Sequence, residues 1–129
     1  MNSTTPLNNN FSVLVVDDEP ANIDILLGIL SPYYNVKVAP SGAVALKIVQ
    51  QFTPDIILLD IMMPGMDGFE VCKRLKSDRL LSQIPVIFIT ALAQGENEEK
   101  GFKLGAVDYI TKPVSPSITL ARVKTHISL

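Results

Sequence analysis

The stretch DIILLDIMMPGMDG, residues 55–68, decides the fold of this chain. Its first half is a short run of Ile and Leu, and a run that is apolar on both faces is typical of a strand covered on both sides of a sheet. The run ends in a carboxylate, Asp60, and PGMDG at 64–68 has the residues of a turn. Because this is the most apolar strand-like run, we predict it at the centre of the sheet, with Asp60 at the edge where the strands end.

Four other segments have the pattern of strands, and helical patterns separate them. They are SVLVV at 12–16, NVKVA at 35–39, IPVIFIT at 84–90 and AVDYI at 106–110. Strands that alternate with helices imply right-handed crossovers and a doubly wound α/β fold. The segment at 35–39 alternates as an edge strand does, with Lys37 pointing outward. We therefore expect a flavodoxin-like, five-stranded parallel sheet in the order 2-1-3-4-5, with helices on both faces.

Local signals mark the ends of several predicted helices. Pro20 suits the first turn of the first helix, Ser41 can cap the second, and Pro116 opens the last. The fourth helix is expected as a polar segment over about 94–104, and Gly105 is its stop signal.

The length and composition of the chain indicate one compact domain. It has 129 residues, of which 47% are hydrophobic, and a net charge of −2, so nothing predicts a basic surface that binds nucleic acid. No apolar run approaches the roughly eighteen residues of a membrane span. The single cysteine, Cys72, excludes an internal disulfide, is expected to be buried, and is consistent with a cytoplasmic protein.

The polar N-terminal stretch MNSTTPLNNN, residues 1–10, is expected to be a flexible leader, because it has neither the basic nor the apolar region of a signal peptide. The domain itself is expected over residues 11–129. The sequence stops inside the last predicted helix without a glycine or another stop signal, which favours a segment of a longer protein.

Five polar residues lie where the predicted strands end, and together they predict a site. They are Asp17 and Asp18 after the first strand, Asp60 and Thr90 at the ends of the third and fourth, and Lys112 after the fifth. In a parallel sheet these ends share one edge, where open α/β sheets bind ligands. Clustered carboxylates repel one another unless a hard cation or a positive side chain lies among them. Mg²⁺ fits, because it prefers oxygen ligands and bridges to phosphate oxygens.

Four motifs carry a resemblance to a known family. They are VVDDEP at 15–20, LLDIMMPGMDG at 58–68, FITA at 88–91 and YITKP at 109–113. In these motifs the chain resembles the receiver domain of bacterial two-component response regulators, over about residues 11–129. Four separate motifs at suitable separations are far more specific than any one of them.

The resemblance implies that Asp60 accepts a phosphoryl group. The donor would be a phosphohistidine of a sensor histidine kinase or of a phosphotransfer protein. Lys112 would place its ammonium beside the Asp60 carboxylate, and later beside its phosphate, where a positive charge stabilises the transferred group. The resemblance also implies a cis peptide bond between Lys112 and Pro113.

The resemblance implies a Mg²⁺ site at the same place. In the family the second carboxylate of the first motif ligates the ion directly and the first acts through water. By that pattern Asp18 and Asp60 are direct ligands and Asp17 is an indirect one. The backbone carbonyl of Met62 completes the set, and a backbone ligand tolerates any side chain.

The resemblance further implies a switch, with no turnover of an external substrate. Thr90 can donate a hydrogen bond to a phosphate oxygen but gains little from a carboxylate, and a switch needs this difference between two states. Tyr109 matches the aromatic residue that receivers swing inward when the threonine moves. The surface of the fourth helix, fifth strand and fifth helix would then change its preference for a partner. That partner would be an output domain beyond Leu129, a separate effector or a second copy of the chain.

Two other functions stay open at this point. A Mg²⁺-dependent phosphohydrolase also forms an aspartyl phosphate, but such enzymes usually carry a cap and a second aspartate where this chain has Met62. A flavin-binding domain would need a Ser/Thr-rich phosphate loop, where this chain has Asp17, Asp18 and Glu19. The site residues also have structural interpretations: a capping aspartate, a solvated acidic loop, a surface Lys-Pro turn and an ordinary half-buried tyrosine.

Two positions depart from the best-known single-domain receivers. Met62 and Leu92, two residues after Asp60 and Thr90, are apolar where polar side chains often help to position water. We therefore expect slow hydrolysis of the aspartyl phosphate.

The remaining candidate residues have ordinary structural interpretations. The methionines Met62, Met63 and Met66 are expected to pack rather than to bind a cofactor. The only histidine, His126, is expected at the surface or against a partner rather than at a metal.

Overall fold

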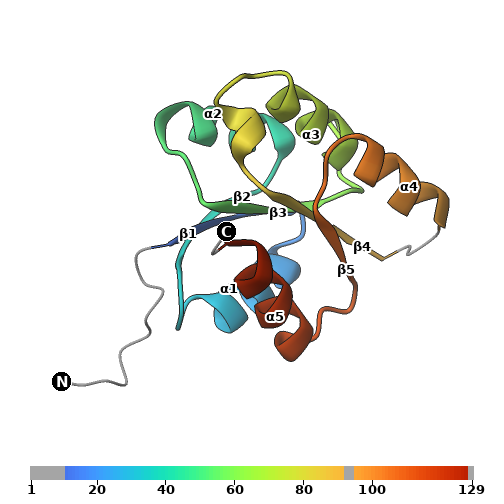
Figure 1. The fold of residues 1–129 in the computed structure, drawn as a ribbon. Helices are drawn as coiled ribbons and strands as arrows, with labels where there is room; N and C mark the ends of the chain where they lie inside the picture. Colours follow the sequence, from blue (N-terminus) through green and yellow to red (C-terminus); the bar gives the residue numbers. More distant parts are fainter. Residues whose placement is uncertain (1–10, 92–94, 128–129) are drawn as a thin grey trace.

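The structure of the chain, a computed structural model, describes residues 11–91 and 95–127, with the backbone alone for 95–97. It confirms the predicted fold, since five parallel strands form one sheet in the order β2-β1-β3-β4-β5 (Figure 1). The strands are β1 (Ser12–Val16), β2 (Asn35–Ala39), β3 (Ile56–Asp60), β4 (Val86–Thr90) and β5 (Asp108–Thr111). The helices are α1 (Pro20–Leu30), α2 (Gly42–Gln51), α3 (Gly68–Lys76), the short 3₁₀ helix η1 (Leu81–Gln83), α4 (Gly95–Lys103) and α5 (Pro116–Ile127). The leader expected over 1–10 lies outside the described residues.

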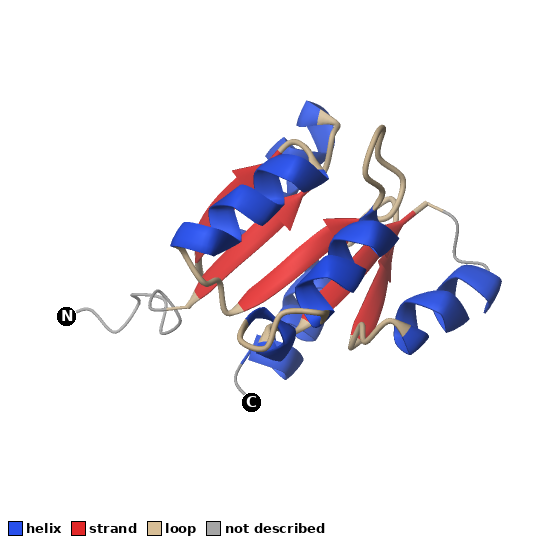
Figure 2. Ribbon diagram, turned by 90° about the horizontal axis from the view of Figure 1, so that it is seen from above, coloured by secondary structure: helices blue, strands red, loops and turns tan. Residues whose placement is uncertain are grey.

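Helices cover both faces of the sheet, as predicted. Figure 1 shows α1 and α5 on one face and α2, α3 and α4 on the other, and Figure 2 shows the strands from above, all running in one direction. β3 lies at the centre and is buried along its whole length, whereas β2 lies at the edge and exposes Lys37. Within the described ranges, no helix is both long and apolar enough to cross a membrane.

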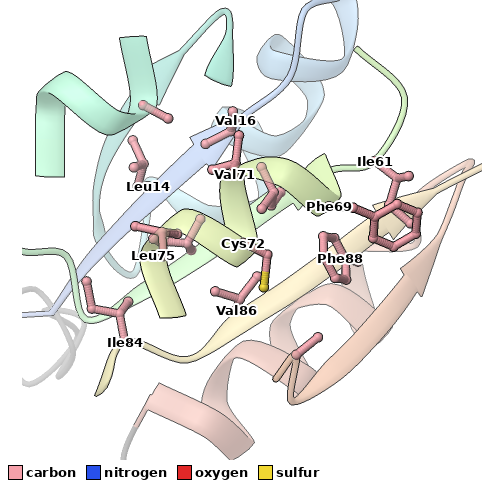
Figure 3. Packing of buried hydrophobic residues seen from close by; sticks show 14 of the residues in the cluster. Leu14, Val16, Ile61, Phe69, Val71, Cys72, Leu75, Ile84, Val86 and Phe88 are labelled. Carbon is pink, nitrogen blue, oxygen red and sulfur yellow. The ribbon is translucent and has the colours of Figure 1, made fainter. Parts of the chain in front are cut away.

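The sheet divides the hydrophobic core into two clusters, because alternate residues of a strand point to opposite faces. One cluster packs under α2 and α3 and includes Val71, Phe88 and Cys72, which is buried as predicted (Figure 3). The other packs under α1 and α5 and includes Leu26 and Val123. Burial of each such Leu, Val or Phe side chain contributes roughly 1.5–3 kcal/mol. The two clusters therefore hold the strands, and the residues at their ends, in fixed positions.

Capping side chains determine where two of the helices begin. Ser41 caps α2, as predicted, because its side-chain oxygen accepts a hydrogen bond of 3.2 Å from the Val44 N–H. Asp67 caps α3 in the same way and accepts from the Glu70 N–H at 2.9 Å. Such caps satisfy amides that the first turn of a helix leaves unpaired. The Asp67 cap thereby ends the loop that follows Asp60.

Two strands begin two residues later than the sequence predicts. β4 begins at Val86, because the Ile84 N–H closes η1 with a hydrogen bond of 3.1 Å. β5 begins at Asp108, and Ala106 is kept out of it because its N–H donates to the Gly101 carbonyl of α4 at 3.0 Å. An amide that bonds to a helix cannot also join the sheet ladder.

Candidate functional site

Three carboxylates converge where β1 and β3 end. The two strands are neighbours, with Val16 opposite Leu59, so Asp17 comes next to Asp60. Asp18 follows at once, and one carboxylate oxygen from each of the three residues lies within 4.8 Å of the other two. Asp17 and Asp60 are buried, with 1% and 3% of their surface exposed, and Asp18 is half-buried. The structure therefore brings together the acidic residues that the sequence placed at this edge.

Lys112 supplies a positive charge opposite these carboxylates. Its Nζ lies 3.2 Å from Asp60 Oδ1, to which it donates a hydrogen bond, and 3.2 Å from Asp17 Oδ2. Its backbone N–H donates to the Thr90 carbonyl at 2.8 Å, which anchors it beside the end of β4. The peptide bond between Lys112 and Pro113 is cis, as the resemblance implies.

Burial and an excess of negative charge control the pKa values at this site. Burial raises the pKa of Asp60 to about 6, and the charge of Asp17 acts in the same direction, against the effect of Lys112. Burial alone would lower the pKa of Lys112, but the carboxylates of Asp60 and Asp17 outweigh it and raise that pKa. Among the described residues, the three clustered carboxylates face this one ammonium, so negative charge remains for a cation to neutralise.

One buried oxygen atom shows that these residues fit a metal ion. Asp17 Oδ2 accepts no hydrogen bond within the described part of the chain, since its contact with Lys112 is an ion pair without hydrogen-bond geometry. Asp17 Oδ1 accepts a hydrogen bond of 2.9 Å from the Glu19 N–H, which holds the carboxylate in place. A buried carboxylate oxygen without a hydrogen bond is costly unless a cation reaches it, and the Lys112 ammonium near this oxygen is shared with Asp60. Together with Asp18 and Asp60, the Asp17 carboxylate forms an all-oxygen donor set that suits a hard cation such as Mg²⁺.

An open pocket of about 340 Å³ leads from the surface to Asp60. Its lining consists of Asp18, Glu19, Asp60, Met62, Ala91 and Lys112. Ala91 contributes only a small side chain to this lining. Leu92, one of the two departures noted in the sequence, lies outside the described residues.

Thr90 and Tyr109 lie on the two strands beside the site. Thr90 is the last residue of β4, next to the end of β3, and is buried. Tyr109 pairs with Phe88 across β4 and β5, and 9% of it is exposed. Its hydroxyl donates to the Glu98 carbonyl of α4 at 3.0 Å. Thr90 thus lies at the edge that carries the carboxylates, and Tyr109 lies further along the sheet, inward and against α4.

One prediction about a side chain outside the acidic cluster is wrong, and another is tested only in part. Met62 does not pack, since 63% of it is exposed: its neighbours Ile61 and Met63 are buried in the core, and Met62 faces solvent between them. His126 is only partly exposed, since its Nε2 is 3.0 Å from Asp108 Oδ2 and 18% of its side chain is exposed, and its position against a partner stays a prediction. The rest of β5, a loop and about three turns of α5 separate His126 from Asp108, so no local pattern indicates their contact.

Two residues that the sequence analysis did not assign also shape the site. Glu19 lines the pocket, and its backbone N–H orients the Asp17 carboxylate. A side chain at Gly68 would overlap the Asp60 carbonyl oxygen and lie 2.8 Å from Ile61 Cα, so glycine lets α3 begin this close to Asp60. The available sequence signal for Gly68 is its place at the end of the PGMDG turn.

Comparison with known proteins agrees with this geometry. The family model of the response regulator receiver domain matches residues 13–124. The probable cyclic di-GMP phosphodiesterase of Vibrio cholerae is 47% identical over 116 residues, which are 90% of this chain and 26% of that protein. The response regulator PleD of Caulobacter vibrioides is 46% identical over 114 residues, 88% of this chain and 25% of that protein. The chain thus spans about a quarter of the length of these two relatives.

A solved structure has the same fold over nearly its whole length. The crystal structure of a putative response regulator from Chloroflexus aurantiacus superposes with a TM-score of 0.88 at 32% sequence identity. The match covers 92% of this chain and 98% of that one. The family model spans all four motifs and every residue of the acidic pocket. The chain belongs to the response regulator receiver domain family.

Proposed function

We propose that this domain is a phosphorylation-dependent signalling switch and that Asp60 is its phosphoacceptor. The observation that carries this proposal is the convergence of the Lys112 ammonium on Asp60 and Asp17, beside a third carboxylate and in an open pocket. A carboxylate is a weak nucleophile, but it forms an acyl phosphate where its charge is neutralised and the donor is in line. Membership of the receiver family supports the same assignment.

In the proposed reaction, a carboxylate oxygen of Asp60 attacks the phosphorus of a phosphohistidine on a sensor histidine kinase or a phosphotransfer protein. A P–O bond forms, the P–N bond breaks, and the electron pair leaves with the imidazole nitrogen. Lys112, already hydrogen-bonded to Asp60, stabilises the negative charge on the transferred group. Water later attacks the phosphorus, releases inorganic phosphate and restores the carboxylate.

We assign the role of holding Mg²⁺ to Asp17, Asp18, Asp60 and the backbone carbonyl of Met62. When bound, the ion would neutralise the carboxylates and the phosphoryl oxygens. The buried Oδ2 of Asp17, which accepts no hydrogen bond from the described residues, and the grouping of the three carboxylates support the first three. Met62 lines the same pocket. Its side chain is exposed, so a backbone carbonyl at this position places no demand on the type of side chain. By the family pattern, Asp17 acts through water.

The state of Asp60 would be read through Thr90 and Tyr109. A phosphoryl oxygen attracts the Thr90 hydroxyl more strongly than a carboxylate does, and Tyr109 follows on the adjacent strand. The surface that responds is formed by α4, β5 and α5. Large apolar side chains exposed there or beside it are Phe102, Val107 and Ile118. They suit a protein partner: an output domain beyond Leu129, a separate effector or a second copy in a homodimer.

As a switch, the domain has a regulatory role and does not turn over an external substrate. The relative PleD is itself named a response regulator. We infer that this domain works in the cytoplasm and that its direct partners are proteins, not nucleic acid or membrane.

Acetyl phosphate and Mg²⁺ test the assignment of Asp60 by intact-mass measurement. We expect the wild type to gain one phosphoryl group and Asp60→Asn to gain none. Asp55→Asn is a matched control, because Asp55 lies just before the other end of β3, where it accepts a hydrogen bond from Ser12. A wild-type chain that gains no phosphoryl group, or an Asp60→Asn chain that gains as much, would contradict the proposal.

The alternative of a phosphohydrolase is not favoured, because the matching family is that of receiver domains. A turnover assay with small phosphate esters separates the two functions. A switch takes at most one phosphoryl group per chain from the ester within the lifetime of its aspartyl phosphate. An enzyme hydrolyses many ester molecules per chain in the same time.

A further inference from the structure

The Tyr109 side chain occupies a narrow space between β4 and α4. Its ring centroid lies 5.7 Å from that of Phe88 and 5.1 Å from that of Phe102, which comes from α4. Its hydroxyl donates to the Glu98 carbonyl, also in α4. The ring is thus held between two aromatic side chains, and its polar end reaches the helix backbone. This arrangement requires α4 to approach β5 closely.

Gly101 is the residue of α4 that makes this approach sterically possible. It is buried, and a Cβ atom added to it would overlap the Tyr109 hydroxyl oxygen. The same atom would lie 2.8 Å from Tyr109 Cζ and 2.9 Å from Phe88 Cδ2, both closer than real Cβ contacts. Glycine in a helix interior is less favourable than alanine, so its presence here goes against local propensity. The space beside Gly101, here called the Gly101 gap, is filled by the Tyr109 hydroxyl.

We propose that Gly101 is a positioning residue of the switch: the Gly101 gap receives the Tyr109 hydroxyl and thereby couples the place of α4 to the inward position of the Tyr109 side chain. This inference rests on the proposed function and adds to it the contact through which α4 takes part. Tyr109 lies three residues before Lys112, and its strand partner Phe88 lies two residues before Thr90. The strand pair that ends at Thr90 and just before Lys112 therefore also carries the tyrosine that sets the distance to α4.

A comparison of two glycine variants tests the steric part of this proposal. Gly28→Ala is the matched control, because Gly28 also lies in a helix, α1, and an added Cβ there would meet nothing within 4 Å. Both variants gain the same helix propensity. We expect Gly28→Ala to raise the melting temperature and Gly101→Ala to lower it. A rise of similar size in both variants would overturn the proposal, since it would mean that no gap is needed.

The same variants can be followed at the tyrosine itself. Tyrosine labelled with ¹³C at Cζ gives one NMR signal for each of the three tyrosines, and Tyr109→Phe identifies one of them. We expect Gly101→Ala to move the Tyr109 signal toward the position of an exposed tyrosine, and Gly28→Ala to leave it in place. An unmoved Tyr109 signal in a folded Gly101→Ala chain would overturn the proposal.

A double variant keeps the test decisive if Gly101→Ala does not fold. Tyr109→Ala removes both the hydroxyl and Cζ and leaves only the contact with Phe88 Cδ2, so in that background Gly101→Ala should lower the melting temperature much less, and the double variant should fold. An equal loss in both backgrounds, or a double variant that stays unfolded while Tyr109→Ala folds, would overturn the coupling. None of these measurements involves phosphate, so they stand apart from the acetyl phosphate test of Asp60.

Discussion

Lys112 Nζ lies 3.2 Å from Asp60 Oδ1, although 52 positions separate the two residues in the sequence. The contact exists because β4 lies between β3 and β5, and the residues that end these strands meet at one edge. The same ammonium also faces Asp17 at 3.2 Å. Lys112 is therefore the residue on which the electrostatic balance of the pocket depends.

Replacing Lys112 tests this dependence. In Lys112→Ala the carboxylates lose their positive partner, and breaking a buried ion pair costs about 3 kcal/mol of unfolding free energy. We expect a loss of about that size at pH 7.5 in urea unfolding without metal, and phosphorylation by acetyl phosphate slowed about 100-fold. Lys47→Ala is the control, because Lys47 is an exposed lysine on α2. Equal stability of the two variants would refute the role given to Lys112.

The raised pKa of Asp60 predicts a stability that falls as pH rises. In the absence of metal this pKa is about 6, above its ordinary value of 3.8. Protonated Asp60 therefore stabilises the fold below about pH 4, and the contribution is lost as pH rises through about 6. The shift corresponds to up to about 3 kcal/mol. We expect the unfolding free energy of the wild type, relative to Asp60→Asn, to fall by up to this amount between pH 4 and 7.5.

Mg²⁺ should reverse this loss, because it binds the ionised carboxylates and competes with the proton. We expect the rise in melting temperature on adding Mg²⁺ to be larger at pH 7.5 than at pH 5 and to shrink in Asp60→Asn. A rise that is the same at both pH values would show that the ion binds elsewhere.

The lifetime of the aspartyl phosphate should depend on the residues that surround the water molecule that hydrolyses it. Met62 is exposed at the pocket, where its thioether cannot orient a water molecule as an amide can. We expect Met62→Asn combined with Leu92→Glu to shorten the lifetime about 10-fold or more. Loss of the phosphoryl group is followed by intact mass after removal of acetyl phosphate, with each single variant as a control. An unchanged lifetime in the combined variant would defeat the idea.

Asp108 ties the start of β5 to the last turns of α5. Arg122 Nη1 donates to both carboxylate oxygens of Asp108 at 3.1 Å. His126 Nε2 lies 3.0 Å from Asp108 Oδ2. Burial raises the pKa of Asp108, but these bonds and that of the Tyr109 N–H outweigh it and lower the pKa below 3.8. The resulting stability is present above that ordinary value and is lost as pH falls through the lowered pKa.

We therefore expect Asp108→Asn to lower the unfolding free energy by about 1 kcal/mol at pH 7 and by less at pH 3. Asp24→Asn, at an exposed position on α1, serves as the control and should have a smaller effect. An equally large loss of unfolding free energy at both pH values would contradict this prediction. It would mean that the charge of Asp108 is not the cause.

The strand patterns and the four motifs were sufficient to predict the fold and the acidic site. Apolar runs such as 56–60 are buried on both sides, and the alternating run at 35–39 forms the edge, so local patterns predicted the strand order. Because parallel strands end at one edge, the positions of Asp60 and Lys112 after their strands predicted that these residues lie close together. The structure shows the distance between them.

Other features left no local signal. The exposure of Met62 depends on which neighbours enter the core, and the bond between His126 and Asp108 depends on how α5 packs on the sheet. A glycine within a polar helix looks unremarkable in the sequence, yet the structure places the hydroxyl of Tyr109 against Gly101.

By itself, the sequence determined the alternation of strands and helices, their parallel order and the edge at which the acidic residues collect. These properties follow from hydrophobic periods and turn residues, which act over a few positions of the chain. The tertiary structure alone decided which oxygen of Asp17 stays without a donor, which carboxylates Lys112 reaches and how closely α4 approaches Tyr109. Such contacts join residues remote in sequence, and they depend on differences of about an ångström in packing that no local pattern encodes.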